Sequence, residues 1–222
     1  MSSGAKDPRI LKLKTTDEMM AILVSKGKPL SEFKKGAKVT VWNKMEKNYS
    51  YVLEENPGQN MAFKPYADPG EMLAGGAFEG KYLNDCLLEF PAEWFLNAIQ
   101  LGTLCPGAAD VSVNLFGVDS RQPLSYWIKS GWLPSAHGGH KKGQHPELSD
   151  AKINVDERGW FQWYCRYWMG RRIPELDRVQ ISRWKAFVRH AGQIKANCKP
   201  GDLECRPRQR QGIFQWAHNP FI

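Results

Sequence analysis

The chain lacks the features that mark several large classes of protein. Its 222 residues contain no run of about 20 apolar residues, so the sequence offers no transmembrane helix. Residues 1–14 contain no apolar stretch of the kind that a secretory signal requires. The Gly-rich run 75–80 lacks the Gly-Lys-Ser/Thr ending of a P-loop. No Ser-His-Asp order is present either. The missing motifs disfavour a kinase and an acyl hydrolase, and the missing membrane span and secretory signal lead us to expect a cytoplasmic protein.

Cysteine is scarce, and its spacing does not define a metal site. The five cysteines are odd in number and scattered, which favours reduced thiols. Cys198 and Cys205 have six residues between them and are able to form a disulfide or to bind a metal; we expect them to be reduced. The spacing of His137, His140 and His145 is not that of a zinc site. We therefore expect no metal and no cofactor.

Positive charge is concentrated in the last third of the chain. Residues 151–222 contain fourteen basic and six acidic residues, a net +8 that equals the net charge of the whole protein. The same segment contains five of the nine tryptophans. Such an excess favours a polyanionic partner. Its basic residues are mostly arginines dispersed among Trp and Gln, which disfavours a membrane surface.

Residue patterns predict an α+β fold that is predominantly α-helical with a small N-terminal β-hairpin. The alternating, β-rich segments 38–42 and 49–53 predict the hairpin. Apolar spacing and end signals predict helices over 16–25, 158–172 and 174–190. We expect residues 1–35 to form an N-terminal segment. Residues 36–222 would form a single mixed domain, basic, aromatic and helical over 151–222.

One stretch, 158–172, combines aromatic rings with guanidinium groups. Wound as a helix at about 100° per residue, it brings Trp160, Tyr164, Tyr167 and Arg171 onto one stripe. The rings either fill a core, with the arginines solvated or paired with carboxylates, or face outward. Outward-facing rings beside guanidinium groups bind bases and phosphates. For Phe161 and Trp168 we favour the core; for the other rings both alternatives stay open.

A second stretch, 81–95, carries candidate catalytic carboxylates. Asp85 and Glu89 stand four residues apart and would share one face of a helix. Pro91 then starts a second helical segment. The polar residues Lys81, Tyr82 and Asn84 precede the apolar ones, as in a cleft lining. The alternative is a surface acid followed by an N-cap acid.

Six motifs are long enough to suggest relatives. They occupy residues 81–86, 89–94, 116–132, 159–172, 183–187 and 205–211. These motifs resemble a widespread family of largely uncharacterised proteins from bacteria, algae and large DNA viruses. The resemblance covers about residues 50–218 and implies no particular activity. In that family a short loop separates Trp132 from Gly159, so the histidine-bearing stretch departs from the pattern.

The first hypothesis for function is a DNA-binding enzyme that acts on bases, specifically a DNA glycosylase. Such enzymes extrude a nucleotide and often need one carboxylate to activate water or to stabilise an oxocarbenium-like centre. Asp85 is the first candidate for this group and Glu89 the second, with Asn84 or Tyr82 contacting the base. The predicted DNA-binding residues are Lys81, Tyr82, Asn84, Trp160, Trp163, Tyr164, Arg166, Tyr167, Arg171, Arg172, Arg183 and Lys185.

Two further hypotheses need no catalysis. A nucleic-acid-binding module needs only the C-terminal third of the chain and explains its charge. A structural protein whose basic face meets an acidic protein explains the charge but not the rings. We expect a monomer whose partner is nucleic acid, DNA in first place, and not a membrane.

Overall fold

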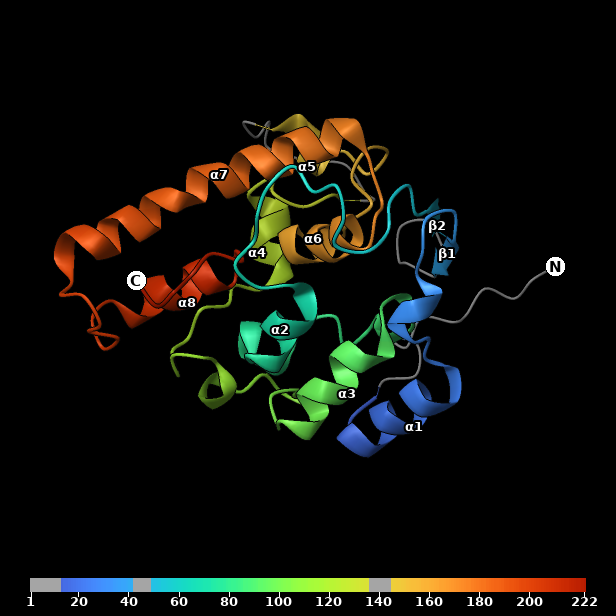
Figure 1. The fold of residues 1–222 in the computed structure, drawn as a ribbon, viewed down its shortest axis with the longest axis horizontal. Coiled ribbons are helices and arrows are strands. Elements are labelled where there is room, and N and C mark those ends of the chain that lie inside the picture. Colours follow the sequence, from blue (N-terminus) through green and yellow to red (C-terminus); the bar gives the residue numbers. More distant parts are fainter. Residues whose placement is uncertain (1–12, 42–48, 136–144) are drawn as a thin grey trace. The chain divides into compact units, whose positions relative to one another are not determined.

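The chain folds mainly into helices. The computed structural model describes residues 13–41, 49–135 and 145–222. Over these ranges it contains eight α-helices, four short 3-10 helices and one two-stranded antiparallel sheet, which confirms the predicted fold class (Figure 1). In chain order the elements are α1 (Thr16–Lys26), η2 (Leu30–Glu32), β1 (Lys38–Val41), β2 (Tyr49–Val52), α2 (Pro69–Ala74), η3 (Ala77–Gly80), η4 (Leu87–Glu89), α3 (Ala92–Gln100), η5 (Val111–Val113), α4 (Leu124–Lys129), α5 (Pro146–Ser149), α6 (Trp160–Trp168), α7 (Pro174–Asn197) and α8 (Pro207–Phe214).

The described residues form two compact units whose segments alternate along the chain. Unit 1 contains the described residues of 33–62 and 122–183, and so holds the hairpin, α4 to α6 and the first part of α7. Unit 2 contains residues 13–32, 63–121 and 184–222, with α1 to α3, the rest of α7 and α8. The division of the chain at residue 35 stays a prediction.

Helix α1 begins at a capping box. The Thr15 side chain accepts a hydrogen bond from the Glu18 N–H, and the Glu18 carboxylate accepts one from the Thr15 N–H. These bonds satisfy amide groups that have no partner inside the helix. The helix ends at Lys26, one residue beyond the predicted range, with Gly27 as its C-cap, and it buries Met19 and Leu23.

The hairpin is short and is held by residues of unit 1. Its strands pair antiparallel, with Val41 opposite Tyr49, and the predicted strand residue Trp42 lies outside the described residues. After the hairpin, the N–H of Glu54 donates to the carbonyl of Gly170 over 2.8 Å. Two strands alone are marginal in water, so these contacts with the residues after α6 stabilise them.

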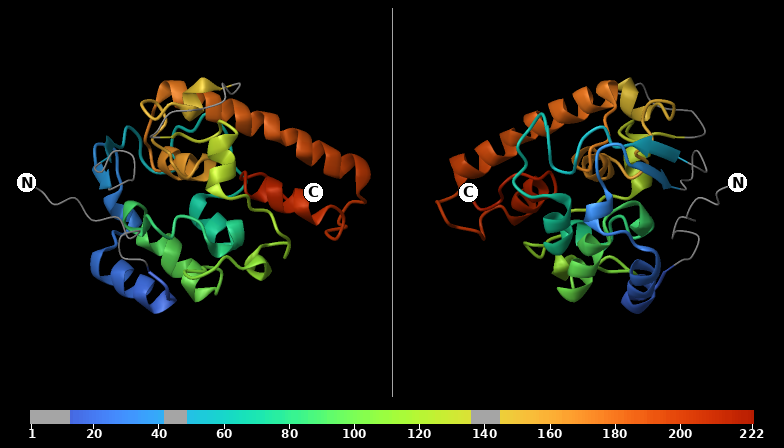
Figure 2. Two further views of the ribbon diagram at one scale, coloured as in Figure 1. Left: turned by 180° about the vertical axis from the view of Figure 1, so that it is seen from behind. Right: turned by 45° about the vertical axis from the view of Figure 1, so that its right-hand side comes forward.

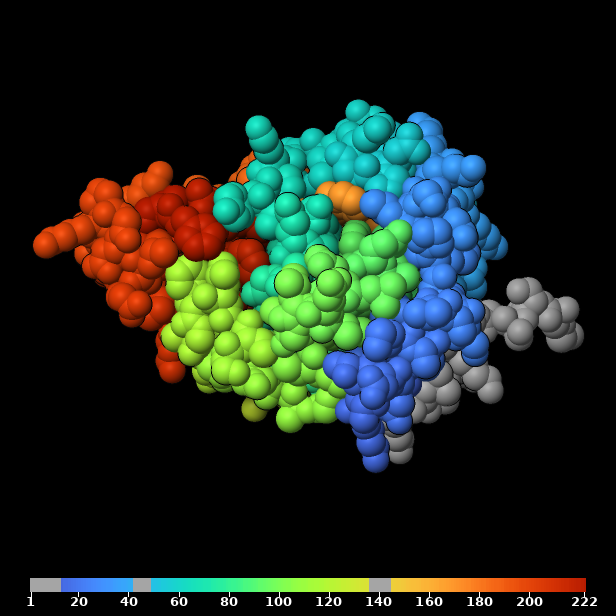
Figure 3. All heavy atoms as spheres, turned by 60° about the horizontal axis from the view of Figure 1, so that its bottom comes forward, coloured from blue at the N-terminus to red at the C-terminus, as the bar shows by residue number. Residues whose placement is uncertain are grey.

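The core of unit 2 forms around α3, which contacts both α1 and α2. Phe95 of α3 and Met72 of α2 have no exposed surface. Gly70 allows this close packing, because a Cβ at that position would lie 2.7 Å from the Trp94 ring. Residues 101–121 follow α3 and lie between it and the carboxyl-terminal segment on the face shown in Figure 3.

A disulfide joins the end of α7 to the residues before α8. Cys198 and Cys205 are bonded, with their Cα atoms 5.8 Å apart, so the expectation that both are reduced is wrong. The reason lies in the intervening turn. The buried Arg210 donates to the carbonyls of Cys205 and Asp202, which folds the turn back on itself. Figure 2 shows α8 beside the second half of α7.

Candidate functional site

Helix α6 carries five of the twelve predicted DNA-binding residues, and it is buried. Its residues from Trp160 to Tyr167 are all buried, and Trp163 and Tyr164 expose no surface. The rings stack on each other: the Trp160 and Tyr164 centroids lie 5.1 Å apart, and those of Trp163 and Tyr167 5.0 Å apart. A helix with apolar groups all round belongs in a core. The alternative in which these rings face outward is therefore wrong.

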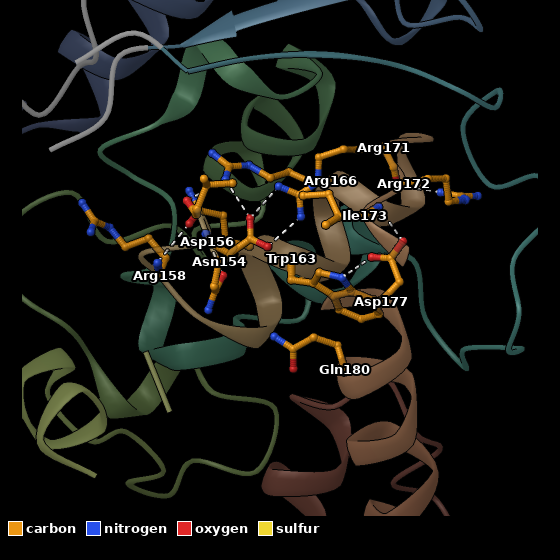
Figure 4. A network of polar contacts seen from close by, with 12 residues as sticks. Asn154, Asp156, Arg158, Trp163, Arg166, Arg171, Arg172, Ile173, Asp177 and Gln180 are labelled. Atoms are coloured by element: carbon orange, nitrogen blue, oxygen red, sulfur yellow. Dashed lines mark hydrogen bonds and ion pairs between the residues drawn. The ribbon is translucent and has the colours of Figure 1, made fainter. Parts of the chain in front are cut away.

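The arginines of this region converge on one buried carboxylate. Nη1 of Arg166 lies 2.7 Å from Oδ1 of Asp156, and Nη2 of Arg171 lies 2.6 Å from Oδ2 (Figure 4). All three side chains are almost fully buried. Charged groups tolerate burial only when they are paired and hydrogen-bonded. Arg166 and Arg171 therefore hold the core of unit 1 together and do not form a phosphate-binding surface.

The charges in this cluster perturb one another. Burial by itself raises the pKa of Asp156, but Arg171 and Arg166 hold that pKa below its ordinary value. Burial raises the pKa of Tyr49, and the two arginines oppose this only in part. The Arg166 guanidinium lies over the Tyr49 ring, 5.0 Å from its centroid. The hairpin therefore covers the cluster with aromatic rings, which favour a cation on their faces.

Two further arginines of the predicted site also serve the protein itself. Arg172 lies over the Tyr167 ring at 4.1 Å and donates to the Tyr167 carbonyl. Arg183 lies over the Trp132 ring at 4.5 Å, and burial lowers its pKa to about 10.

The first part of the second predicted stretch belongs to a strained loop instead of a helix, whereas the helix expected after Pro91 forms as α3. Phe78, Glu79 and Leu83 have φ angles of +59°, +61° and +61°. Side chains rarely adopt such angles, and each costs on the order of 1–3 kcal/mol, so the surrounding structure must impose them. Strain of this kind concentrates at functional sites. We call residues 76–86 the strained loop.

The two candidate carboxylates do not share a helix face. Asp85 lies in a turn of the strained loop and is half-buried, whereas Glu89 lies in η4 and is 2% exposed. The positive φ at Leu83 turns the chain between Lys81 and Asp85, so no continuous helix forms. Glu89 therefore belongs to the core, and its expected catalytic role is not supported.

Residues 105–114 hydrogen-bond to the strained loop and hold its conformation. The Cys105 N–H donates to the Gly80 carbonyl over 2.9 Å, and the Asp110 N–H donates to the Glu79 carbonyl over 3.1 Å. The Asn84 Nδ2 donates to the Cys105 carbonyl over 2.9 Å. These bonds replace the helical hydrogen bonds that the loop lacks, which explains how it tolerates its backbone angles.

Two side chains of the loop serve it structurally. The Asn84 amide also donates to the carbonyl of Gly80, over 3.2 Å. Its Oδ1 is buried and accepts no hydrogen bond in the described part of the chain. Tyr82 packs against Phe78, with ring centroids 4.4 Å apart. Asn84 and Tyr82 therefore shape the loop, and its half-buried charged residues are Lys81 and Asp85.

Unit 2 carries an exposed basic surface, most of whose residues were not among the predicted site residues. Its six cations are all exposed, and only Lys185 was among the predicted site residues. Residues 184–199 contain no acid, and residues 200–222 contain two, Asp202 and Glu204. Lys185 and Arg189 are four residues apart on α7 and so lie on one side of it. The basic surface consists of Lys185, Arg189, Lys195, Lys199, Arg206 and Arg208.

A row of aromatic rings accompanies this basic surface. Trp184 stacks on His218 at 4.4 Å with an interplanar angle of 10°. Phe187 stacks on Trp216 at 4.6 Å with the same interplanar angle, and His190 lies 4.5 Å from Phe187. All of these rings are half-buried. We call the set Trp184, Phe187, His190, Trp216 and His218 the ring stack.

The surroundings of the two histidines in the ring stack lower their pKa and favour the neutral imidazole. Burial lowers the pKa of His218 below its ordinary value of 6.5. Burial also lowers the pKa of His190, with the charge of Arg189 adding to the effect. Neutral imidazole rings stack like other flat aromatic faces. The ring stack therefore places half-buried aromatic rings, packed on one another, in the same segments as exposed lysines and arginines.

Among the described residues, no group of three or more His, Cys, Asp or Glu side chains is arranged to hold a metal ion. His137 and His140 lie outside those residues, and His145 precedes α5. No helix in the described ranges is long and apolar enough to cross a membrane.

Comparisons with known proteins do not identify the chain. No family model, no curated protein and no solved structure matches it. The resemblance carried by the sequence motifs stays a prediction.

Proposed function

We propose that this protein binds nucleic acid, DNA in first place, through the basic surface and the ring stack. The observation that carries the proposal is their common position on the second half of α7 and on the residues that follow it. Lys185 and Arg189 are exposed on the same helix that contributes Trp184 and Phe187 to the stack. Lysine and arginine neutralise phosphates, and ring faces stack with bases.

The chemistry favours nucleic acid over an acidic protein. An acidic protein would need only the cations, whereas a single strand of nucleic acid offers both phosphates and unpaired bases. Neutralised phosphates release counterions, at a slope of about −0.7 in log K against log salt for each contact on a single strand. Six contacts would therefore give a slope of about −4.

The test compares charge reversal at two places of unit 2. The double variant Lys185→Glu/Arg189→Glu removes two cations of the basic surface. Lys26→Glu/Lys28→Glu reverses two exposed lysines at the end of α1 and serves as the matched control. Binding to a fluorescent single strand and to its duplex is measured from 50 to 300 mM salt.

We expect the first variant to bind about tenfold or more weakly and to reduce the magnitude of the salt slope by about 1.4 to 1.8, because two phosphate contacts are lost. The control should bind like the wild-type protein. A flat salt dependence of the wild-type protein, or equal losses in both variants, would rule out the proposed interface.

A second candidate is a DNA glycosylase, and the strained loop is the observation that favours it. The loop stores backbone strain and contains the half-buried Asp85, four residues after Lys81. A carboxylate in such a position is suited to activate water or to stabilise an oxocarbenium-like centre during base release. Glu89 is buried, so the half-buried Asp85 is the preferred candidate for this role.

Asp85→Asn separates catalysis from binding. We expect the variant to retain affinity for DNA and to lose base release from strands that contain modified bases. If the wild-type protein releases no base from any such strand, the glycosylase candidate is wrong and the binding function is unaffected.

A further inference from the structure

Three segments of unit 2 bring exposed aromatic rings together beside the ring stack. The ring centroids of Tyr66 and Phe221 lie 6.5 Å apart, and the Phe116 centroid lies 6.0 Å from that of Phe221. Tyr66 is 49% exposed and Phe221 is 48% exposed, whereas Phe116 is half-buried. The segments that carry these rings lie side by side in Figure 3, in teal, yellow-green and red. We call Tyr66 and Phe221 the open rings.

Backbone contacts join the open rings to the ring stack. The N–H of Tyr66 donates to the carbonyl of Ala217 over 2.8 Å. Ala217 stands between Trp216 and His218, two members of the ring stack. Its φ of +53° is rare for a residue with a side chain, so the surrounding structure imposes this turn. The open rings therefore continue the ring stack.

Arg210 of α8 holds the backbone that carries Phe221. Its guanidinium donates to the carbonyl of Pro220 over 2.5 Å and to that of Ile222 over 2.9 Å. The two acceptors flank Phe221, and Arg210 itself is fully buried. The position of this ring is therefore fixed from within the protein, while about half of the ring stays in contact with solvent.

Exposed cations accompany the open rings. Lys64, two residues before Tyr66, is exposed. Two exposed cations of the basic surface, Arg206 and Arg208, stand at the start of the helix that holds Phe221. Exposed rings alone would suit many partners, but rings accompanied by cations match a partner that carries both flat bases and phosphates.

We propose that the open rings stack with unpaired bases, so that the preferred partner of the basic surface is single-stranded nucleic acid. This inference rests on the proposed function and names its partner more closely. The rings of the ring stack pack on one another, whereas Tyr66 and Phe221 each leave about half of their surface to solvent. Bases inside a duplex stack on each other, whereas the bases of a single strand are free to stack on protein rings.

The experiment measures affinity for three fluorescent probes of equal length: a single strand, its duplex, and a strand whose sugars carry no bases. The base-free strand keeps the phosphates but offers nothing to stack. The variants are Tyr66→Ala, Phe221→Ala and Tyr66→Phe. The matched control is Tyr126→Ala, which removes an equally exposed tyrosine from α4 in unit 1. Circular dichroism checks that each variant is folded.

We expect Tyr66→Ala and Phe221→Ala each to bind the single strand about fivefold or more weakly, which corresponds to the loss of one base–ring stack. The salt slope should stay the same, because no phosphate contact is lost. Tyr66→Phe keeps the ring and should bind like the wild-type protein, as should Tyr126→Ala. Affinity for the duplex and for the base-free strand should be equal in all of these proteins.

Several outcomes separate this inference from the proposed function. If the two alanine variants bind the single strand as tightly as the wild-type protein, or lose equally on all three probes, the base-stacking role is wrong and the binding function is unaffected. Equal affinity of the wild-type protein for the single strand and the base-free strand would reject that role without any variant. If the wild-type protein binds none of the three probes, the proposed function fails, and the inference fails with it.

Discussion

Arg171 holds Asp156 with two parallel hydrogen bonds. Its Nη1 lies 2.9 Å from Oδ1 and its Nη2 lies 2.6 Å from Oδ2, and Arg166 adds a third bond to Oδ1. Planar guanidinium and carboxylate groups match in this geometry, and lysine does not reproduce it. The pair joins the residues before α6 to those after it, so it fixes both ends of the buried helix.

The first prediction concerns the loss of this carboxylate. Asp156→Ala should lower the free energy of unfolding by about 3–5 kcal/mol, because two guanidinium groups stay buried without their anion. Arg178→Ala breaks the exposed pair with Glu147 and should cost less than about 1 kcal/mol. Urea unfolding followed by circular dichroism measures both. Equal effects of the two substitutions would show that the buried cluster does not stabilise the fold.

The second prediction is the direction of the acid response. Asp156 has a pKa below its ordinary value of 3.8 in the folded protein, so the unfolded chain binds this proton more readily. Its contribution to stability is therefore complete above about pH 4 and is lost as the pH falls through the folded pKa. Urea midpoints measured between pH 2 and 6 should fall steeply only below pH 4.

A control for this response is Asp68→Asn. Burial raises the pKa of Asp68, so its titration acts in the opposite direction, and asparagine still caps α2. The fall below pH 4 should persist in this variant. If the fall below pH 4 is absent in this variant, the acid response comes from the Asp68 cap of α2 and not from Asp156.

The third prediction compares two glycines. Gly170 has a φ of +111°, and a Cβ there would lie 2.0 Å from the Glu55 carbonyl oxygen, so Gly170→Ala should cost at least about 2 kcal/mol. Gly192 is exposed within α7, and a Cβ there meets nothing within 4 Å. Gly192→Ala should raise stability by about 0.5–1 kcal/mol, because alanine favours helix. Thermal unfolding of both variants checks the opposite signs.

The sequence predicts that α6 is a helix, but it does not predict whether the rings of this helix face the core or the solvent. Aromatic residues all round a helix indicate burial, and this signal would have favoured the core for Trp160 and Trp163 as well. The partner of Arg166 and Arg171 was harder to find. Asp156 stands ten and fifteen residues from them, and a chain reversal at Gly159 brings it back. Sequence spacing does not encode such a pairing.

The strained loop could not be predicted from local preferences. Phe, Glu and Leu disfavour positive φ, so residues 78–83 contradict their own conformational propensities. The backbone contacts with residues 105–110 impose these angles, and those contacts are long-range. The polar character of Lys81 and Asp85 did mark the place, although the expected helix did not form.

The last prediction concerns the disulfide between Cys198 and Cys205. It closes a loop of eight residues, and a loop of this size is worth about 2 kcal/mol through the entropy of the unfolded chain. The pair Cys198→Ser/Cys205→Ser should therefore lower the free energy of unfolding by about this amount. A dithiol reductant should do the same to the wild-type protein and nothing to the double variant. Since Arg210 still binds the carbonyls of the turn, nucleic-acid affinity should change less than twofold. A large loss of affinity on reduction would show that the disulfide, and not Arg210, positions Lys199 and Arg206.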